Sequence, residues 1–108
     1  MTDKIVVLVT CGNRKEAGKL AKSLVEKRLA ACVNLLPGIS SWYWWENKVT
    51  EDHEILLVIK SSRTKYAELE KEVLRLHSYA VPEVIALQIV DGSGNYLGWI
   101  EESLKEVV

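Results

Sequence analysis

Two short segments of this chain are apolar at every position, and they constrain the fold more than any other feature. Residues 5–9 read Ile-Val-Val-Leu-Val, and residues 55–59 read Ile-Leu-Leu-Val-Ile. Each run is too short for a buried helix, so each predicts a strand. Because successive side chains of a strand point to opposite faces of the sheet, these two strands are apolar on both faces. Each face of the predicted sheet therefore needs a cover.

Three further segments have helical periodicity. The first follows Asn13, which with Glu16 forms a capping-box pattern, and its apolar positions recur at helical spacing up to Leu29. The second is predicted to begin at Thr64 as its cap. The third follows the turn at residues 91–94. The predicted apolar faces of the second and third helices are Tyr66, Leu69, Val73 and Leu76, and Tyr96, Ile100, Leu104 and Val107.

The remaining segments predict further strands. Residues 31–36 and 39–45 have strand character on either side of Pro37-Gly38, a polar hairpin is predicted within 46–53, and residues 54–60 and 84–90 follow as strands. The order is strand, helix, two strands, helix, strand and a C-terminal helix. This order predicts an α+β fold of the ferredoxin-like, split βαβ type, with both main helices on one face of an antiparallel sheet.

The second face of that sheet has two candidate covers. The C-terminal helix is one, but a single short helix is too small to cover four strands. Packing against other copies of the chain is the other, and we expect an oligomer. A run of aromatic residues supports this expectation, because its side chains alternate across both faces of a strand. These predicted interface residues are Trp42, Tyr43, Trp44 and Trp45.

Composition restricts the class of protein. With 108 residues the chain is expected to form one domain, residues 1–108. A net charge of −1 argues against a partner that is nucleic acid or an anionic membrane. No segment approaches the roughly 20 apolar residues of a transmembrane helix. Two cysteines do not make a disulfide framework, so we expect a reducing, cytoplasmic location.

The expected strand order is 4-1-3-2, with strands one and three parallel and the aromatic hairpin at the far end. One rim of the sheet then collects the polar and sulfur-bearing residues Cys11, Cys32, Lys60, His77, Tyr79 and Glu83. Two thiols and an imidazole at one rim suit copper(I) better than a four-ligand zinc site. The alternatives are small buried cysteines and an ordinary histidine at a helix end. Lys60 and Glu83 suggest an ion pair, and nothing local marks an activated nucleophile, so no enzyme is predicted.

Several motifs together resemble the CutA divalent-cation tolerance proteins. They are Leu29 to Asn34 (LAACVN), Ser41 to Glu46 (SWYWWE), Glu54 to Lys60, His77 to Glu83 (HSYAVPE) and Tyr96 to Ile100. The resemblance covers nearly the whole chain in order. It implies a homotrimer of ferredoxin-like subunits with the hairpin packed across subunits, and a role in tolerance to divalent metals, copper above all.

By position, the resemblance implies metal ligation by Cys32 and His77. Some members have a further metal-implicated cysteine at the position of Val9, and in this chain Cys11 lies two residues beyond it. It also implies a cleft between subunits with polar residues at Lys60, Tyr79 and Glu83. Ser78, Ala80 and Asn47 replace the usual proline, polar residue and glycine. The alternatives are a regulatory trimer that binds a small ligand, an anion or a metabolite, in this cleft, and an enzyme that uses it.

Overall fold

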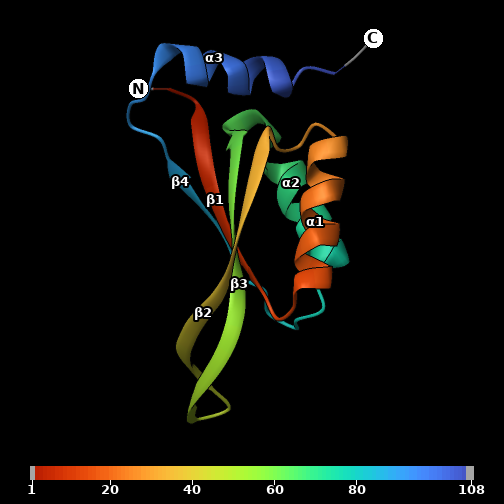
Figure 1. The fold of residues 1–108 in the computed structure, drawn as a ribbon, viewed down its shortest axis with the longest axis vertical. Helices are drawn as coiled ribbons and strands as arrows, with labels where there is room; N and C mark the ends of the chain where they lie inside the picture. Colours follow the sequence, from red (N-terminus) through yellow and green to blue (C-terminus); the bar gives the residue numbers. More distant parts are fainter. Residues whose placement is uncertain (1, 107–108) are drawn as a thin grey trace.

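The computed structural model describes residues 2–106. The elements, in chain order, are β1 (Lys4–Cys11), α1 (Arg14–Glu26), β2 (Cys32–Trp45), β3 (Lys48–Ser62), a 3-10 turn (Arg63–Lys65), α2 (Tyr66–Leu76), β4 (Val84–Gln88) and α3 (Gly94–Ser103) (Figure 1). This is the predicted order of strands and helices. Val107, which was expected on the apolar face of α3, lies outside the described residues. None of the helices in residues 2–106 is long and apolar enough to cross a membrane.

The four strands form one sheet in the order β2-β3-β1-β4, and every neighbouring pair is antiparallel. The strand order was predicted correctly, but the parallel pairing of strands one and three was wrong. The crossover through α1 makes β1 and β2 parallel, and the hairpin reverses the chain from β2 to β3. Because β3 lies between β1 and β2, it must be antiparallel to both.

Helices α1 and α2 cover one face of the sheet (Figure 1). The hydrophobic core lies between these two helices and the sheet. Its strand residues occupy alternate positions, such as Val7, Val9, Leu57 and Ile59, and these four have no exposed surface. α3 crosses the end of the sheet where β3 ends, and buries Ile100 and Leu104 there.

The opposite face of the sheet is also apolar, as predicted, and is less well covered. Cross-strand partners share a face, and the register pairs Leu8 with both Val58 and Ile85. Leu8 and Val58 are half-buried, whereas Ile85 and Leu87 remain 49% and 51% exposed. Helix α3 therefore does not complete the cover of this face.

β2 and β3 continue beyond the rest of the sheet as a two-stranded arm (Figure 1). β1 ends with Cys11 opposite Ile55, so residues 39–45 and 48–54 pair only with each other. A register shift between Leu36 and Ile39, at Pro37-Gly38, marks the base of the arm. At its tip, Glu46 and Asn47 both have positive φ. A two-residue hairpin turn with this backbone conformation has a twist that matches the twist of the two strands.

The predicted cap of α1 is confirmed, whereas the cap of α2, the start of β3 and the end of β4, at Gln88 instead of residue 90, differ from the structure. Asn13 caps α1 by accepting a hydrogen bond from the Glu16 amide at 2.8 Å. Thr64 does not cap α2, because it lies within the 3-10 turn, and no side chain caps the helix at Lys65. β3 begins at Lys48 rather than near residue 54, because pairing with the aromatic strand keeps its polar first half extended.

A buried carboxylate joins the two helices of the covered face. Glu72 of α2 is 7% exposed and accepts hydrogen bonds from Ser23 at 2.6 Å and from Lys27 at 2.9 Å, both near the end of α1. Arg75, one turn along α2, donates two more. These donors, Arg75 first, hold the pKa of Glu72 well below its usual value of 4.5 despite its burial.

We expect Glu72→Gln to lower the free energy of unfolding at neutral pH by about 1–3 kcal/mol, because the charged hydrogen bonds are lost. The folded-state pKa lies below the unfolded one, so the contribution is present above pH 4.5 and declines as the pH falls below it. The difference between wild type and variant should therefore shrink in acid. Urea unfolding across this pH range measures it. Glu26→Gln, in the exposed pair with Lys22, is the control and should change little.

Candidate functional site

The antiparallel pairing divides the six predicted rim residues between two ends of the sheet. Cys11 is opposite Ile55, whereas Lys60 is opposite Val6 and Cys32. Five positions separate residues 55 and 60, which is roughly 17 Å along a strand. The prediction of a single rim was therefore wrong. Cys11, His77, Tyr79 and Glu83 lie at the end from which the arm projects, and the placement of the hairpin at the far end was also wrong.

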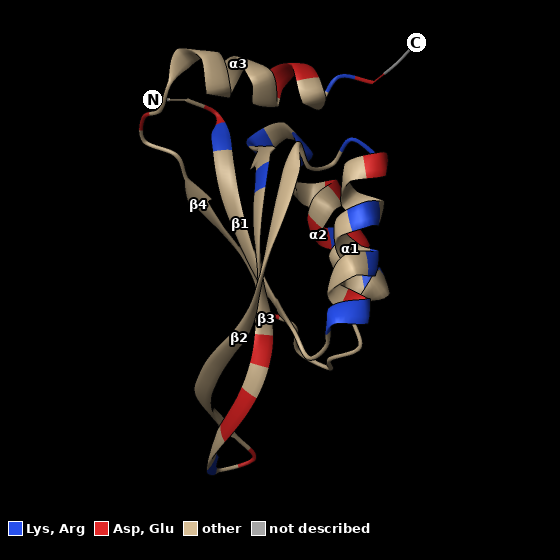
Figure 2. Ribbon diagram, in the orientation of Figure 1, with Lys and Arg blue, Asp and Glu red and all other residues tan. Residues whose placement is uncertain are grey.

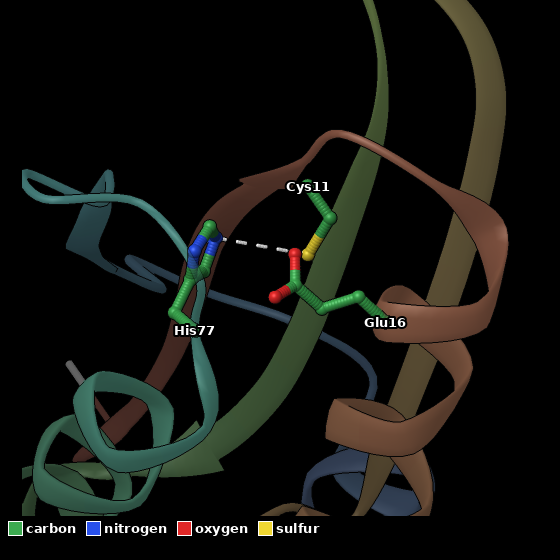
Figure 3. A group of neighbouring side chains, drawn as sticks. All are labelled: Cys11, Glu16 and His77. Atoms are coloured by element: carbon green, nitrogen blue, oxygen red, sulfur yellow. Dashed lines mark hydrogen bonds between the residues drawn. The ribbon is translucent and has the colours of Figure 1, made fainter.

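Three potential metal ligands meet at the end of β1. They are Cys11, Glu16 from the first turn of α1, and His77 from the end of α2, and their ligand atoms all lie within 4.8 Å of one another (Figure 3). The Cys11 Sγ and His77 Nε2 atoms are 3.8 Å apart. Glu16 was predicted only as part of the capping box. Its position in the first turn of α1, five residues after Cys11, is the sequence signal that could have placed it here.

Hydrogen bonds already occupy this cluster. His77 donates from Nε2 to the Thr10 carbonyl oxygen at 2.7 Å and accepts at Nδ1 from the Tyr79 amide at 3.1 Å, which defines its tautomer. The Glu16 carboxylate accepts from the amide and the hydroxyl of Ser78, at 2.8 and 3.1 Å. Together these bonds hold the loop after α2 against the ends of β1 and α1.

The thiol of Cys11 is buried and protonated, which makes it a poor nucleophile. It has no exposed surface. Burial, and then the negative charges of Glu16 and Glu54, raise the pKa of Cys11 to about 12. The thiol therefore stays protonated at neutral pH, and a metal ion must displace that proton before the sulfur can bind it.

A groove of about 670 Å³ lies beside this cluster, at the base of the arm. Tyr79 and Glu83, two of the predicted cleft residues, line it together with four aromatic residues of the arm, Trp42 to Trp45. The Tyr79 hydroxyl donates to Glu54 at 2.9 Å, and Tyr43 donates to Asp52. Burial and the Glu54 hydrogen bond raise the pKa of Tyr79, and burial and the Glu54 charge raise the pKa of Glu83. Glu54 and Asp52 were not predicted as site residues.

The other two predicted site residues are on the opposite face from the core, at the far end of the sheet. Cys32 and Lys60 are cross-strand partners, and Lys60 donates to Asn34. Lys60 therefore forms no ion pair with Glu83 within one chain. Cys32 is separated from Cys11 and His77 in the same way, so a single chain does not assemble the predicted three-ligand set.

This arrangement defines a small α+β protein with a four-stranded antiparallel sheet, three helices, a projecting aromatic arm and a Cys-Glu-His cluster at its base. Residues 5–103 match the family described as "CutA1 divalent ion tolerance protein", and the chain belongs to this family. The fold is also that of solved family members. It matches CutA from Xylella fastidiosa with a TM-score of 0.94 at 36% identity, covering 96% of this chain and 100% of that one.

Two relatives show how far the similarity extends. The "Divalent-cation tolerance protein CutA" of Thermus thermophilus is 46% identical over 98 residues, which are 91% of this chain and 95% of that protein. "Protein CutA, chloroplastic" of Arabidopsis thaliana is 50% identical over 94% of this chain, but this chain spans only 56% of its length. The Thermus relative is named as a tolerance protein, and neither of the two names describes an enzyme.

The prediction of a cytoplasmic location is wrong as an inference from this sequence. A solved relative from Archaeoglobus fulgidus, 38% identical with a TM-score of 0.91 over 94% of this chain and 99% of that one, is described as a periplasmic protein. The Arabidopsis relative is described as chloroplastic. A small number of cysteines is compatible with several compartments, so it does not determine the location.

The protonated state of Cys11 gives a direct test. In the Cys32→Ser variant, where Cys11 is the remaining thiol, we expect alkylation at pH 8 to be at least about a hundredfold slower in the folded protein than in urea. Raising the pKa from 9.0 to about 12 lowers the thiolate fraction by about a thousandfold. Mass spectrometry against time measures the rate. Equal rates in the folded and unfolded protein would contradict a buried, protonated thiol.

Proposed function

We propose that this protein is a ferredoxin-like homotrimer that acts in divalent-cation tolerance and binds copper, or another divalent cation, weakly and reversibly at Cys11, Glu16 and His77. Family membership supports the tolerance role. The observation that carries the binding proposal is the convergence of a thiol, a carboxylate and an imidazole within 4.8 Å.

The donor set fits a soft or borderline metal in its chemistry. Thiolate and imidazole ligands suit copper and zinc, and a carboxylate completes the three-ligand set. The set lacks the fourth ligand of a closed structural zinc site, which favours an exchangeable ion.

Binding must compete with bonds that the cluster already makes. The ion replaces the proton on Cys11. For the ion to replace the Thr10 carbonyl at His77 Nε2, the Nε2 proton must move to Nδ1, and this ends the hydrogen bond that Nδ1 accepts from the Tyr79 amide. Glu16 must also share its oxygens with Ser78. Each displacement costs free energy, so the affinity is expected to be modest and to depend on pH.

Two exposed apolar surfaces of the chain support the proposal of a trimer. One is the incompletely covered apolar face of the sheet, with Ile85 and Leu87 half-exposed. The other is the arm, where Trp42 and Trp44 are 68% and 74% exposed. Apolar surfaces of this kind on a small chain are typical of surfaces that pack against a partner. Symmetric packing of three identical chains would bury both.

The metal proposal predicts a binding curve that shifts with pH. Because each bound thiolate releases one proton, the affinity for Cu(I) or Zn(II) should rise about tenfold for each pH unit between about 6 and 8. Calorimetry with Zn(II), and competition with a chelator for Cu(I) under anaerobic conditions, measure it.

Cys11→Ser should weaken this binding by at least about tenfold, because an alcohol is a poor ligand for these metals. Cys32→Ser is the matched control and should leave the affinity unchanged, since Cys32 lies at the far end of the sheet. Absence of binding at about 1 mM free metal would contradict the proposal. Equal weakening by both variants would contradict the assignment of the ligand to Cys11.

The trimer proposal predicts a sedimentation mass three times the 12.2 kDa of one chain. Val58→Glu places a charge at the centre of the apolar face, and we expect it to weaken association by at least about a hundredfold. Val25→Glu is the control, because Val25 is 42% exposed on helix α1, away from that face. A stable monomeric wild-type chain would contradict the proposal.

A further inference from the structure

The loop that follows α2 is held in place by hydrogen bonds to the proposed metal ligands. The Tyr79 amide donates to Nδ1 of His77 at 3.1 Å. The amide and the hydroxyl of Ser78 donate to the two carboxylate oxygens of Glu16, at 2.8 and 3.1 Å. The Tyr79 ring also packs against the His77 ring, with their centroids 4.7 Å apart. The atoms that fix this loop therefore belong to the side chains that a metal ion would use.

The hydrogen bond between Tyr79 and His77 is incompatible with metal ligation. A neutral imidazole carries one proton, so a His77 side chain that binds a metal ion through Nε2 carries its proton on Nδ1. A metal-ligating histidine donates this second N–H to a carboxylate, a carbonyl or water. Here Nδ1 faces the N–H of Tyr79, which is itself a donor. Ligation through Nδ1 would displace the same amide directly, so either mode of binding ends this hydrogen bond.

The hydrogen bonds between Ser78 and Glu16 weaken in the same event. Both oxygens of the carboxylate accept from Ser78, and an ionised acceptor makes stronger hydrogen bonds than a neutral one. A metal ion on Glu16 neutralises part of that negative charge. Metal binding therefore weakens the contacts of two successive residues of the loop.

The loop also connects the cluster with the base of the arm. Figure 2 shows acidic positions along the β3 side of the arm. One of these residues, Glu54, accepts a hydrogen bond from the Tyr79 hydroxyl at 2.9 Å. The same hydroxyl lies close to Gly12, where a methyl group would be only 3.0 Å from its oxygen. The Tyr79 side chain therefore fits its position closely, and a movement of its backbone would disturb the contact with Glu54.

We propose that residues 78–83 act as a latch, which these hydrogen bonds hold closed and which opens when the cluster binds a metal ion. This inference rests on the proposed metal function, and it gives Ser78 and Tyr79 a part in setting the metal affinity. Because metal binding and latch closure oppose each other, thermodynamic linkage requires that a weaker latch gives tighter binding. Opening also changes the Tyr79 contact with Glu54, so metal occupancy is communicated to the arm.

Amide hydrogen exchange on the full-length chain, with and without saturating Zn(II), tests the latch. We expect zinc to speed the exchange of the Tyr79 amide by at least about tenfold, because that amide loses its acceptor. The amides of the paired strands β1 and β3 should keep their protection. Calorimetry on the same sample establishes saturation.

The outcomes separate this inference from the metal function on which it rests. Saturation with zinc, together with unchanged or slower exchange at Tyr79, would overturn the latch and leave the metal proposal intact. Absence of zinc binding at about 1 mM would overturn the metal proposal and the latch with it.

Variants outside the metal ligands test the linkage. Ser78→Ala removes one hydrogen bond to Glu16, so it should tighten zinc binding by about threefold or more. Ser78→Thr is the matched control, because it keeps both the hydroxyl and the amide, and it should bind zinc as the wild type does. Tyr79→Phe removes the hydrogen bond to Glu54 and should also tighten binding. Unchanged or weaker zinc binding by both Ser78→Ala and Tyr79→Phe would overturn the latch.

Discussion

The antiparallel pairing of β1 with β3 determines which residues meet at each end of this molecule. Its register places Cys11 opposite Ile55 and Lys4 opposite Ser62. β1 ends at residue 11, so the remainder of β3 continues without it and becomes the arm. The same register puts the loop after α2 beside the base of the arm and sends Cys32 and Lys60 to the other end.

A polar cluster and a groove lie side by side at the base of the arm. In the Cys11, Glu16 and His77 cluster, hydrogen bonds and burial satisfy each group in its uncharged or paired state, so a ligand must displace existing partners. In the neighbouring groove, Glu54 is buried and accepts a hydrogen bond from the Tyr79 hydroxyl. Binding of a metal ion at the cluster is therefore expected to be weak and coupled to proton release.

Much of the local structure was predictable because it depends on neighbours in the chain. Asn13 and Glu16 form a cap within one turn, and the apolar runs at residues 5–9 and 55–59 form strands through side-chain alternation alone. Thr64 shows the limit of such signals, since a 3-10 turn replaces the expected cap. The polar residues at the start of β3 carry no strong strand signal, and their extended conformation depends on pairing with the aromatic strand.

The sequence by itself determined the order of the elements, the two-sided apolar strands, the aromatic run and the family motifs, because these properties belong to short segments. It also predicted Cys11, His77, Tyr79 and Glu83 as site residues, and the structure places these four at the same end of the sheet. Only the tertiary structure separated Cys32 and Lys60 from them and added Glu16 and Glu54. The direction in which neighbouring strands run controls those contacts, and an error in one pairing moves a residue by the length of the sheet. The proximity of residues 11, 54 and 77 is therefore a property of the folded sheet and of no single segment.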